Sequence, residues 1–188
     1  SVQEPDTLIA GVRSLAPGQI LRFDGATERE ESYWRLPPES LRHISRQEAT
    51  EGTRDLLREA TRLQLVADVP SGIFLSSGAD STALAILAAE ASSRPVRTFT
   101  VVFDEAHLSE ERRASEVSGR FGCRHESVRV TGTAAALDLE KALQDQDQPS
   151  GDGLNTWLVS RAARQAGLTV ALSGLGGDEL FAGYPAFR

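Results

Sequence analysis

Two short loops hold the residues whose types and spacing could do chemistry. The first spans Leu75 to Thr82 and combines serines, one glycine and the carboxylate of Asp80. Small hydroxyl residues and a glycine allow backbone N–H groups to close around phosphate oxygens at the positive end of a helix. A carboxylate beside a phosphate is unfavourable unless a cation such as Mg²⁺ lies between them. The loop therefore predicts a site for magnesium and a polyphosphate.

The second loop spans Ser173 to Glu179 and places the carboxylate of Asp178 after small residues, at the expected start of a helix. Each loop follows a short apolar segment typical of a buried strand, and neighbouring strands lie about 4.8 Å apart. If those two strands are neighbours, Asp80 and Asp178 could share one Mg²⁺ ion at ligand distances of about 2.0–2.1 Å. Without a cation the two carboxylates would repel each other.

Plainer interpretations exist for the same residues. The first loop could be a serine-rich turn that caps a helix, Asp178 could be a helix cap, and Glu179 a first-turn acid. The presence of both loops in one chain favours the phosphate site. A Walker A loop is excluded, because the single lysine, Lys141, lies inside a predicted helix. The dinucleotide fingerprint needs glycine where Glu179 stands, and a nucleophile elbow needs glycine where Phe74 stands.

Strand and helix patterns alternate along most of the chain and would position these loops. Ser45 and Glu48 form a capping box for a helix that ends before Pro70. Beyond it the sequence predicts strands at 72–75, 98–103, 125–130 and 168–172, and helices at 81–91, 109–121, 133–144 and 155–166. Strands joined by such helices pair in parallel through right-handed crossovers. We expect an open, mostly parallel α/β sheet with helices on both faces, which binds ligands beyond the carboxyl ends of its strands.

Residues 1–38 have a different character. They contain two short apolar runs, Leu8–Ala10 and Gln19–Phe23, with a turn at Ala16–Gly18 between them. These are too few apolar residues for a core of their own. Pro37-Pro38 indicates a linker to the domain that begins at residue 39.

Composition narrows the partners and the compartment. The net charge of −7 argues against nucleic acid as the main partner, and no apolar run reaches the roughly 18–20 residues that span a membrane. Cys123 is the single cysteine, so we expect a reducing compartment, the cytoplasm. The chain has no methionine and opens in a polar stretch, which indicates a fragment of a longer protein.

The loops also carry a resemblance to a known family. Residues 76–81, Ser-Ser-Gly-Ala-Asp-Ser, resemble the Ser-Gly-Gly-x-Asp-Ser PP-loop of N-type ATP pyrophosphatases. Residues 173–184 resemble the second loop of asparagine synthetases, and the similarity continues through 99–105 and 147–155. Parts of residues 1–38 look like the tail of that family's glutaminase domain. The chain therefore looks like that tail followed, over 39–188, by an ATP-binding synthetase domain truncated on its C-terminal side.

This resemblance implies an adenine-nucleotide-hydrolase-like fold and an amidation in two steps. The side-chain carboxylate of aspartate attacks the α-phosphate of ATP, pyrophosphate leaves, and ammonia derived from glutamine displaces AMP from the acyl-adenylate. Asp80 and Asp178 would be catalytic and would hold Mg²⁺, and Leu75 and Val102 would lie near the adenine. The residues implied in ATP binding are Leu75, Ser76, Ser77, Gly78, Asp80, Ser81, Val102, Ser173 and Gly174.

Two departures from the family pattern leave the acceptor open. Ser77 stands where the family usually has glycine, and Leu175 stands where asparagine synthetases commonly have glutamate. Leu175, Glu179 and Asp152 are the candidate substrate-binding residues. The alternatives are adenylation of another carboxylate, as in β-lactam-forming or peptide-cyclising relatives, or ATP binding without turnover; metal-binding aspartates count against the last. The family's cysteine nucleophile and catalytic lysine have no counterpart here, so we expect the fragment alone to be inactive.

Overall fold

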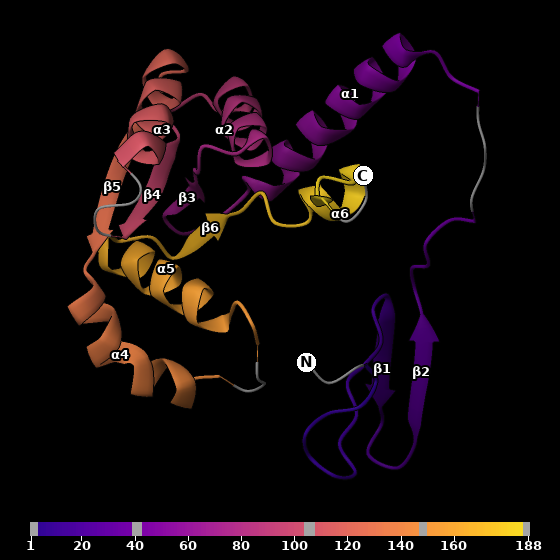
Figure 1. Cartoon of the computed structure of the whole chain (residues 1–188). Helices are drawn as coiled ribbons and strands as arrows, with labels where there is room; N and C mark the ends of the chain where they lie inside the picture. Colours follow the sequence, from indigo (N-terminus) through magenta and orange to yellow (C-terminus); the bar gives the residue numbers. More distant parts are fainter. Residues whose placement is uncertain (1–3, 39–42, 104–107, 147–149, 186–188) are drawn as a thin grey trace.

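Backbone hydrogen bonds arrange the strands in two separate sheets (Figure 1). The computed structural model describes residues 4–38, 43–103, 108–146 and 150–185. An antiparallel hairpin is formed by β1 (Gln19–Phe23) and β2 (Glu28–Ser32). The other elements are α1 Arg46–Gln64, β3 Ser71–Phe74, α2 Ala79–Ala91, β4 Arg97–Phe103, α3 Leu108–Arg120, β5 Arg124–Val130, α4 Gly132–Gln144, α5 Gly153–Gln165, β6 Val170–Leu172 and α6 Gly177–Phe181.

The second sheet has four parallel strands in the order β5-β4-β3-β6. Gly72 pairs with Ala171 and Ile73 with Leu172, so the two strands that precede the loops are neighbours, as the shared-metal argument requires. Each predicted strand and helix of this region is present, with ends that differ by a few residues. The expected open parallel α/β sheet is confirmed.

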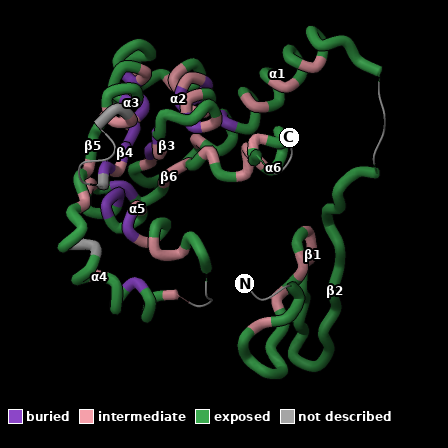
Figure 2. The backbone as a smooth tube through the Cα atoms, in the orientation of Figure 1, coloured by how far each residue is buried: buried purple, intermediate pink, exposed green. Residues whose placement is uncertain are grey.

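Helices cover both faces of this sheet, and the alternation of strand side chains decides which residues meet which helix. On one face Ile73 packs with Ala88 of α2, and Leu75 packs with Ala85 of α2 and Ala114 of α3. On the other face Phe99 packs with Ala163 of α5, and Phe74 is packed against the same cluster. Figure 2 shows the buried residues gathered along β3, β4 and the helix segments that face them. The helices on both faces are thereby confirmed.

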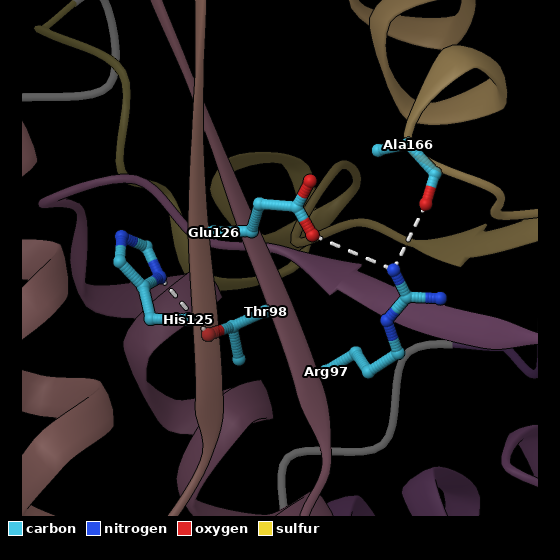
Figure 3. Close-up of polar contacts among 5 residues, drawn as sticks. All are labelled: Arg97, Thr98, His125, Glu126 and Ala166. Carbon is cyan, nitrogen blue, oxygen red and sulfur yellow. Dashed lines mark hydrogen bonds and ion pairs between the residues drawn. The ribbon is translucent and has the colours of Figure 1, made fainter.

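A polar cluster at the amino end of β4 ties three elements together (Figure 3). Arg97 Nη2 donates a hydrogen bond to the Ala166 carbonyl after α5, at 2.9 Å, and lies 3.5 Å from Glu126 Oε2 of β5. Thr98 Oγ1 lies 3.0 Å from His125 Nδ1. Partial burial lowers the pKa of His125, which therefore favours its neutral form in this bond. These contacts join β4, β5 and the end of α5 at the side of the sheet opposite the two loops.

Helix α1 begins as predicted, with the side chain of Ser45 accepting from the Glu48 N–H at 3.2 Å and the Ser45 N–H donating to Glu48 Oε2 at 2.8 Å. It packs against α2, yet much of its apolar stripe is exposed, with Leu56 74% accessible. No described helix is both long enough and apolar enough to cross a membrane.

The amino-terminal segment forms a hairpin that the sequence analysis did not predict. The run Gln19–Phe23 is a strand as its apolar character indicates, whereas Leu8–Ala10 lies in turns. Its partner β2, Glu-Arg-Glu-Glu-Ser, was not predicted because it carries no apolar alternation. Both strands are largely exposed, as Figure 2 shows.

Candidate active site

The first loop starts from a backbone position held firmly by β4. The Leu75 N–H donates to the Phe99 carbonyl at 2.7 Å, and the Thr100 hydroxyl donates to the Leu75 carbonyl at 2.5 Å. The chain then turns into α2, whose N-cap is Gly78 with φ −74° and ψ 159°. No side chain caps this helix start, and residues of the loop and of the first turn of α2 line the cavity described below.

Three consecutive N–H groups of this loop have acceptors. The Ser76 N–H donates to Ser81 Oγ at 3.1 Å, and the Gly78 N–H donates to Ser76 Oγ at 3.2 Å. The Ser77 N–H donates to Glu110 Oε1 at 3.3 Å, across from the first turn of α3. Two of these acceptors are hydroxyls of the loop itself, and the third is a carboxylate from another element.

The second loop connects β6 to the short helix α6. Its turn needs the left-handed conformation of Gly176, with φ +95°, immediately before α6. The Leu175 N–H donates to Ser173 Oγ at 3.2 Å. Asp178 lies in the first turn of α6, where a carboxylate is favoured by the helix dipole.

The two loops touch each other at their glycines. A Cβ added to Gly174 would lie 2.9 Å from the Ser81 nitrogen and 3.1 Å from the Asp80 Cβ. A Cβ added to Gly177 would overlap the Asp80 carboxylate, at 2.5 Å from its Cγ. The carboxylate of Asp80 therefore lies against the backbone residue that immediately precedes Asp178.

Both loops line one cavity of about 660 Å³ at the carboxyl ends of the strands. This volume is within the range of about 300–1,000 Å³ that is typical of small-molecule sites. The predicted residues that line it are Leu75, Ser76, Gly78, Asp80, Ser81, Ser173, Gly174, Leu175, Asp178 and Glu179. Asp80 and Asp178 thus face a common space, together with the small residues that were expected to bind phosphate.

Three predicted residues lie elsewhere. Ser77 does not line the cavity, although its N–H reaches Glu110, which does. Val102 is 1% exposed, and Val101 lines the cavity instead, because successive strand side chains point to opposite faces. Asp152 precedes α5 and accepts hydrogen bonds from Asn155 Nδ2 at 3.2 Å and Thr156 Oγ1 at 3.1 Å.

The cavity also contains residues that sequence reasoning did not assign to the site. Phe74, Phe99, Val101 and Val159 form an apolar wall between the sheet and α5, and Asn155, Glu110 and Tyr184 add polar groups. The strand pattern could have indicated the wall, because Phe99 and Val101 share the face covered by α5. Asp104, Glu105 and residues 147–149, which took part in the sequence resemblance, lie outside the described residues.

Glu179 and Tyr184 form a hydrogen-bonded pair at the edge of the cavity. The Tyr184 hydroxyl donates to Glu179 Oε1 at 2.7 Å. This hydrogen bond is the main cause that lowers the pKa of Glu179, and it raises the pKa of Tyr184. Leu175, on the same loop, is 85% exposed.

The two carboxylates of the site suit a metal ion that is held partly by the protein and partly by the phosphates of a substrate. Among the described residues no group of three or more metal-binding side chains occurs. Mg²⁺ is commonly held by one or two carboxylates together with water and substrate phosphates. The pair Asp80 and Asp178 fits that donor set.

Comparison with known proteins places these features in a family. Residues 52–188 match the asparagine synthase family. The chain belongs to this family. One relative is an amidase (chyE) of Penicillium rubens, 34% identical over 206 residues that cover 98% of this chain and 30% of that protein. Another is the glutamine-hydrolyzing asparagine synthetase 1 of Bacillus subtilis, 31% identical over 193 residues that cover 100% of this chain and 30% of that protein.

The chain spans about 30% of the length of each of these two relatives. Among solved structures, the NH3-dependent NAD synthetase of Campylobacter jejuni aligns with a TM-score of 0.45 at 15% identity, over 75% of this chain and 61% of that chain.

Proposed function

We propose that this chain supplies the ATP-binding part of a cytoplasmic, ATP-dependent amidotransferase that activates a carboxylate as an acyl-adenylate. The observation that carries the proposal is the meeting of the two loops in one cavity, with Asp80 packed against Gly177 and Asp178 in the next position. Membership of the asparagine synthase family supports it.

The residues fit a polyphosphate bridged by Mg²⁺. Asp80 and Asp178 offer two carboxylates in a space lined by backbone and hydroxyl groups of Ser76, Gly78 and Ser173. When bound, Mg²⁺ would neutralise charge on the pyrophosphate as it leaves. Phosphate oxygens would replace the present acceptors of the loop N–H groups, and the first turn of α2 adds the positive end of its dipole.

The apolar wall offers a surface for the flat base of the nucleotide. Val101 and Val159 approach the cavity from the sheet and from α5, close to Leu75 at the start of the loop. We propose that the adenine lies here, with Val101 in the place expected of Val102. An oxygen of the acceptor carboxylate then forms a bond to the α-phosphorus of ATP. The bond between that phosphorus and the oxygen that bridges it to the β-phosphorus breaks, and pyrophosphate leaves. Ammonia derived from glutamine subsequently displaces AMP.

The acceptor is proposed to be the side-chain carboxylate of aspartate. Leu175 offers no polar atom where asparagine synthetases commonly have glutamate, but Glu179 lines the same cavity, and the hydrogen bond from Tyr184 lowers its pKa. Asp152 does not line it, so of the two candidate substrate-binding acids we propose that Glu179 faces an ammonium group. A second candidate function is adenylation of another carboxylate, and it is kept because one relative is named an amidase and not an asparagine synthetase.

Residues 1–38 are proposed to be the tail of a glutaminase domain. Their apolar side chains are widely exposed, including Ile9, Phe23 at 66% and Trp34. Such a surface is typical of a segment that packs against a further domain.

The direct test is product formation from ATP by the full-length protein. We expect AMP and pyrophosphate in equal amounts, dependent on a carboxylate, and ATP–pyrophosphate exchange in the presence of aspartate. Release of ADP and phosphate would contradict adenylation. Binding of ATP without AMP formation under any acceptor would favour a nucleotide-binding module instead.

A further inference from the structure

Glu110 brings a charged side chain from a separate element onto the first loop. It lies in the first turn of α3, and its Oε1 accepts the Ser77 N–H at 3.3 Å, 33 residues away in the sequence. It lines the cavity that Asp80 and Asp178 also line. The neighbouring N–H groups of Ser76 and Gly78 are bonded to neutral hydroxyls of the loop. Glu110 therefore contributes the one anionic acceptor that these three N–H groups have.

We propose that Glu110 is a positioning residue whose carboxylate accepts the Ser77 N–H when no ligand is bound. When a polyphosphate binds, a phosphate oxygen takes over this hydrogen bond and the Glu110 carboxylate moves away from the Ser77 N–H. The inference rests on the proposed function, because it requires the loop to receive phosphate. A carboxylate oxygen and a phosphate oxygen are both anionic acceptors of backbone N–H groups. Two such anions on one donor would repel each other, so occupancy by the ligand excludes this contact of Glu110.

This arrangement makes phosphate binding depend on the charge of the ligand. Glu110 repels a ligand more strongly the more negative it is, so free pyrophosphate is affected more than its Mg²⁺ complex. A ligand without phosphate, such as adenosine, does not compete for the Ser77 N–H. Glu110 thus favours the magnesium-loaded form of the nucleotide over the free form.

The test measures the affinity of pyrophosphate and adenosine by isothermal titration calorimetry in the full-length protein. The variants are Glu110→Gln and Glu110→Ala, with Glu116→Gln as the matched control. Glu116 is on the same helix, exposed, and 3.6 Å from Arg112. We expect both Glu110 variants to bind Mg²⁺-free pyrophosphate about fivefold more tightly, the effect of roughly one unit charge near 4 Å in water. The gain should be smaller with Mg²⁺ and absent for adenosine, and Glu116→Gln should match the wild type.

The outcomes separate this inference from the proposed function. If the wild type binds pyrophosphate and the Glu110 variants bind it equally or more weakly, Glu110 orders the loop rather than holding a phosphate position, and the inference is wrong. An equal gain for adenosine would also overturn it. If neither the wild type nor Glu116→Gln binds pyrophosphate or ATP, the phosphate site itself fails, and the inference fails with it.

Discussion

The Asp80 carboxylate lies against Gly177, so that a Cβ added to Gly177 would come within 2.5 Å of the Asp80 Cγ. Gly183 stands in the same relation to Asp178, where an added Cβ would lie 2.8 Å from its Cγ. Each proposed magnesium ligand therefore faces a glycine that leaves room for its carboxylate. The carboxylates can lie in these positions because the two glycines have no side chain there.

Replacing Gly177 by alanine should disturb the metal site more than the fold. The added methyl must displace the end of a flexible side chain, that of Asp80, which costs the folded state little. We expect Mg²⁺-dependent ATP affinity to fall about tenfold or more, as is typical when a residue that orients a metal ligand is changed. Calorimetry with and without Mg²⁺ measures this. Gly52→Ala, where an added Cβ has open space, is the control, and an equal loss there would contradict the account.

Tyr184→Phe should raise the pKa of Glu179 toward its ordinary value. The hydrogen bond from the Tyr184 hydroxyl is the main cause of the lowered pKa of Glu179. A carboxylate whose pKa is lower in the folded than in the unfolded state stabilises the fold at a pH above its ordinary pKa. This contribution is lost as the pH falls through the pKa of the folded state. The difference in unfolding free energy between wild type and variant should therefore be present at neutral pH and vanish in acid. Carbon-13 NMR titration of the Glu179 carboxyl checks the shift; an unchanged pKa would show that the bond is not maintained in solution.

Leu175→Glu tests whether the loop residue selects the acceptor. Leucine offers no polar atom to a substrate ammonium, whereas glutamate at this position would add a carboxylate to the one that Glu179 provides. We expect the variant to form AMP from aspartate more efficiently than the wild type, measured over a panel of carboxylates in the full-length protein. If the wild type already uses aspartate well and the glutamate variant gains nothing, Leu175 does not determine the substrate and Glu179 suffices.

Gly72→Ala should destabilise the strand that carries the first loop. Gly72 is buried, and an added Cβ would lie 3.0 Å from Leu168 Cδ1 and 3.1 Å from the Arg97 carbonyl of β4. Overpacking of this kind typically costs about 1–3 kcal/mol, which urea unfolding would detect. Gly119→Ala, with no atom close to the added Cβ, should be neutral or stabilising by about 0.4–1 kcal/mol. A similar loss in both variants would contradict the packing argument.

The sequence was sufficient to predict the fold and the two loops that line one side of the cavity. Glycine and serine allow the backbone of the two loops to close around phosphate oxygens. The alternation of strands and helices brings such loops to one edge of the sheet. The adjacency of β3 and β6 was only a condition of the sequence argument, and the pairing of Gly72 with Ala171 in the structure meets it and places the loops side by side.

Residues that depend on side-chain direction or on distant contacts were harder to predict. The resemblance named Val102, whereas Val101 lines the cavity, because successive side chains of a strand point to opposite faces of the sheet. In the sequence Glu110 is one of several neighbouring charged residues, a pattern typical of the solvent-exposed face of a helix. Nothing in the sequence indicates its contact with Ser77. Tyr184 belonged to a recognised motif, but its bond to Glu179 depends on the turn after α6, where Ala182 has φ +54°.

The central claim is that Asp80 and Asp178 share one Mg²⁺ ion on a polyphosphate. The most direct test is the affinity of ATP for the wild type, Asp80→Ala and Asp178→Ala, each measured with and without Mg²⁺, with Asp55→Ala on the exposed surface of α1 as the control. We predict that either site variant loses most of the Mg²⁺-dependent gain in affinity, while its affinity for Mg²⁺-free ATP does not fall and rises if the removed carboxylate repels the free phosphates. An equal loss of affinity with and without Mg²⁺ would contradict the shared metal.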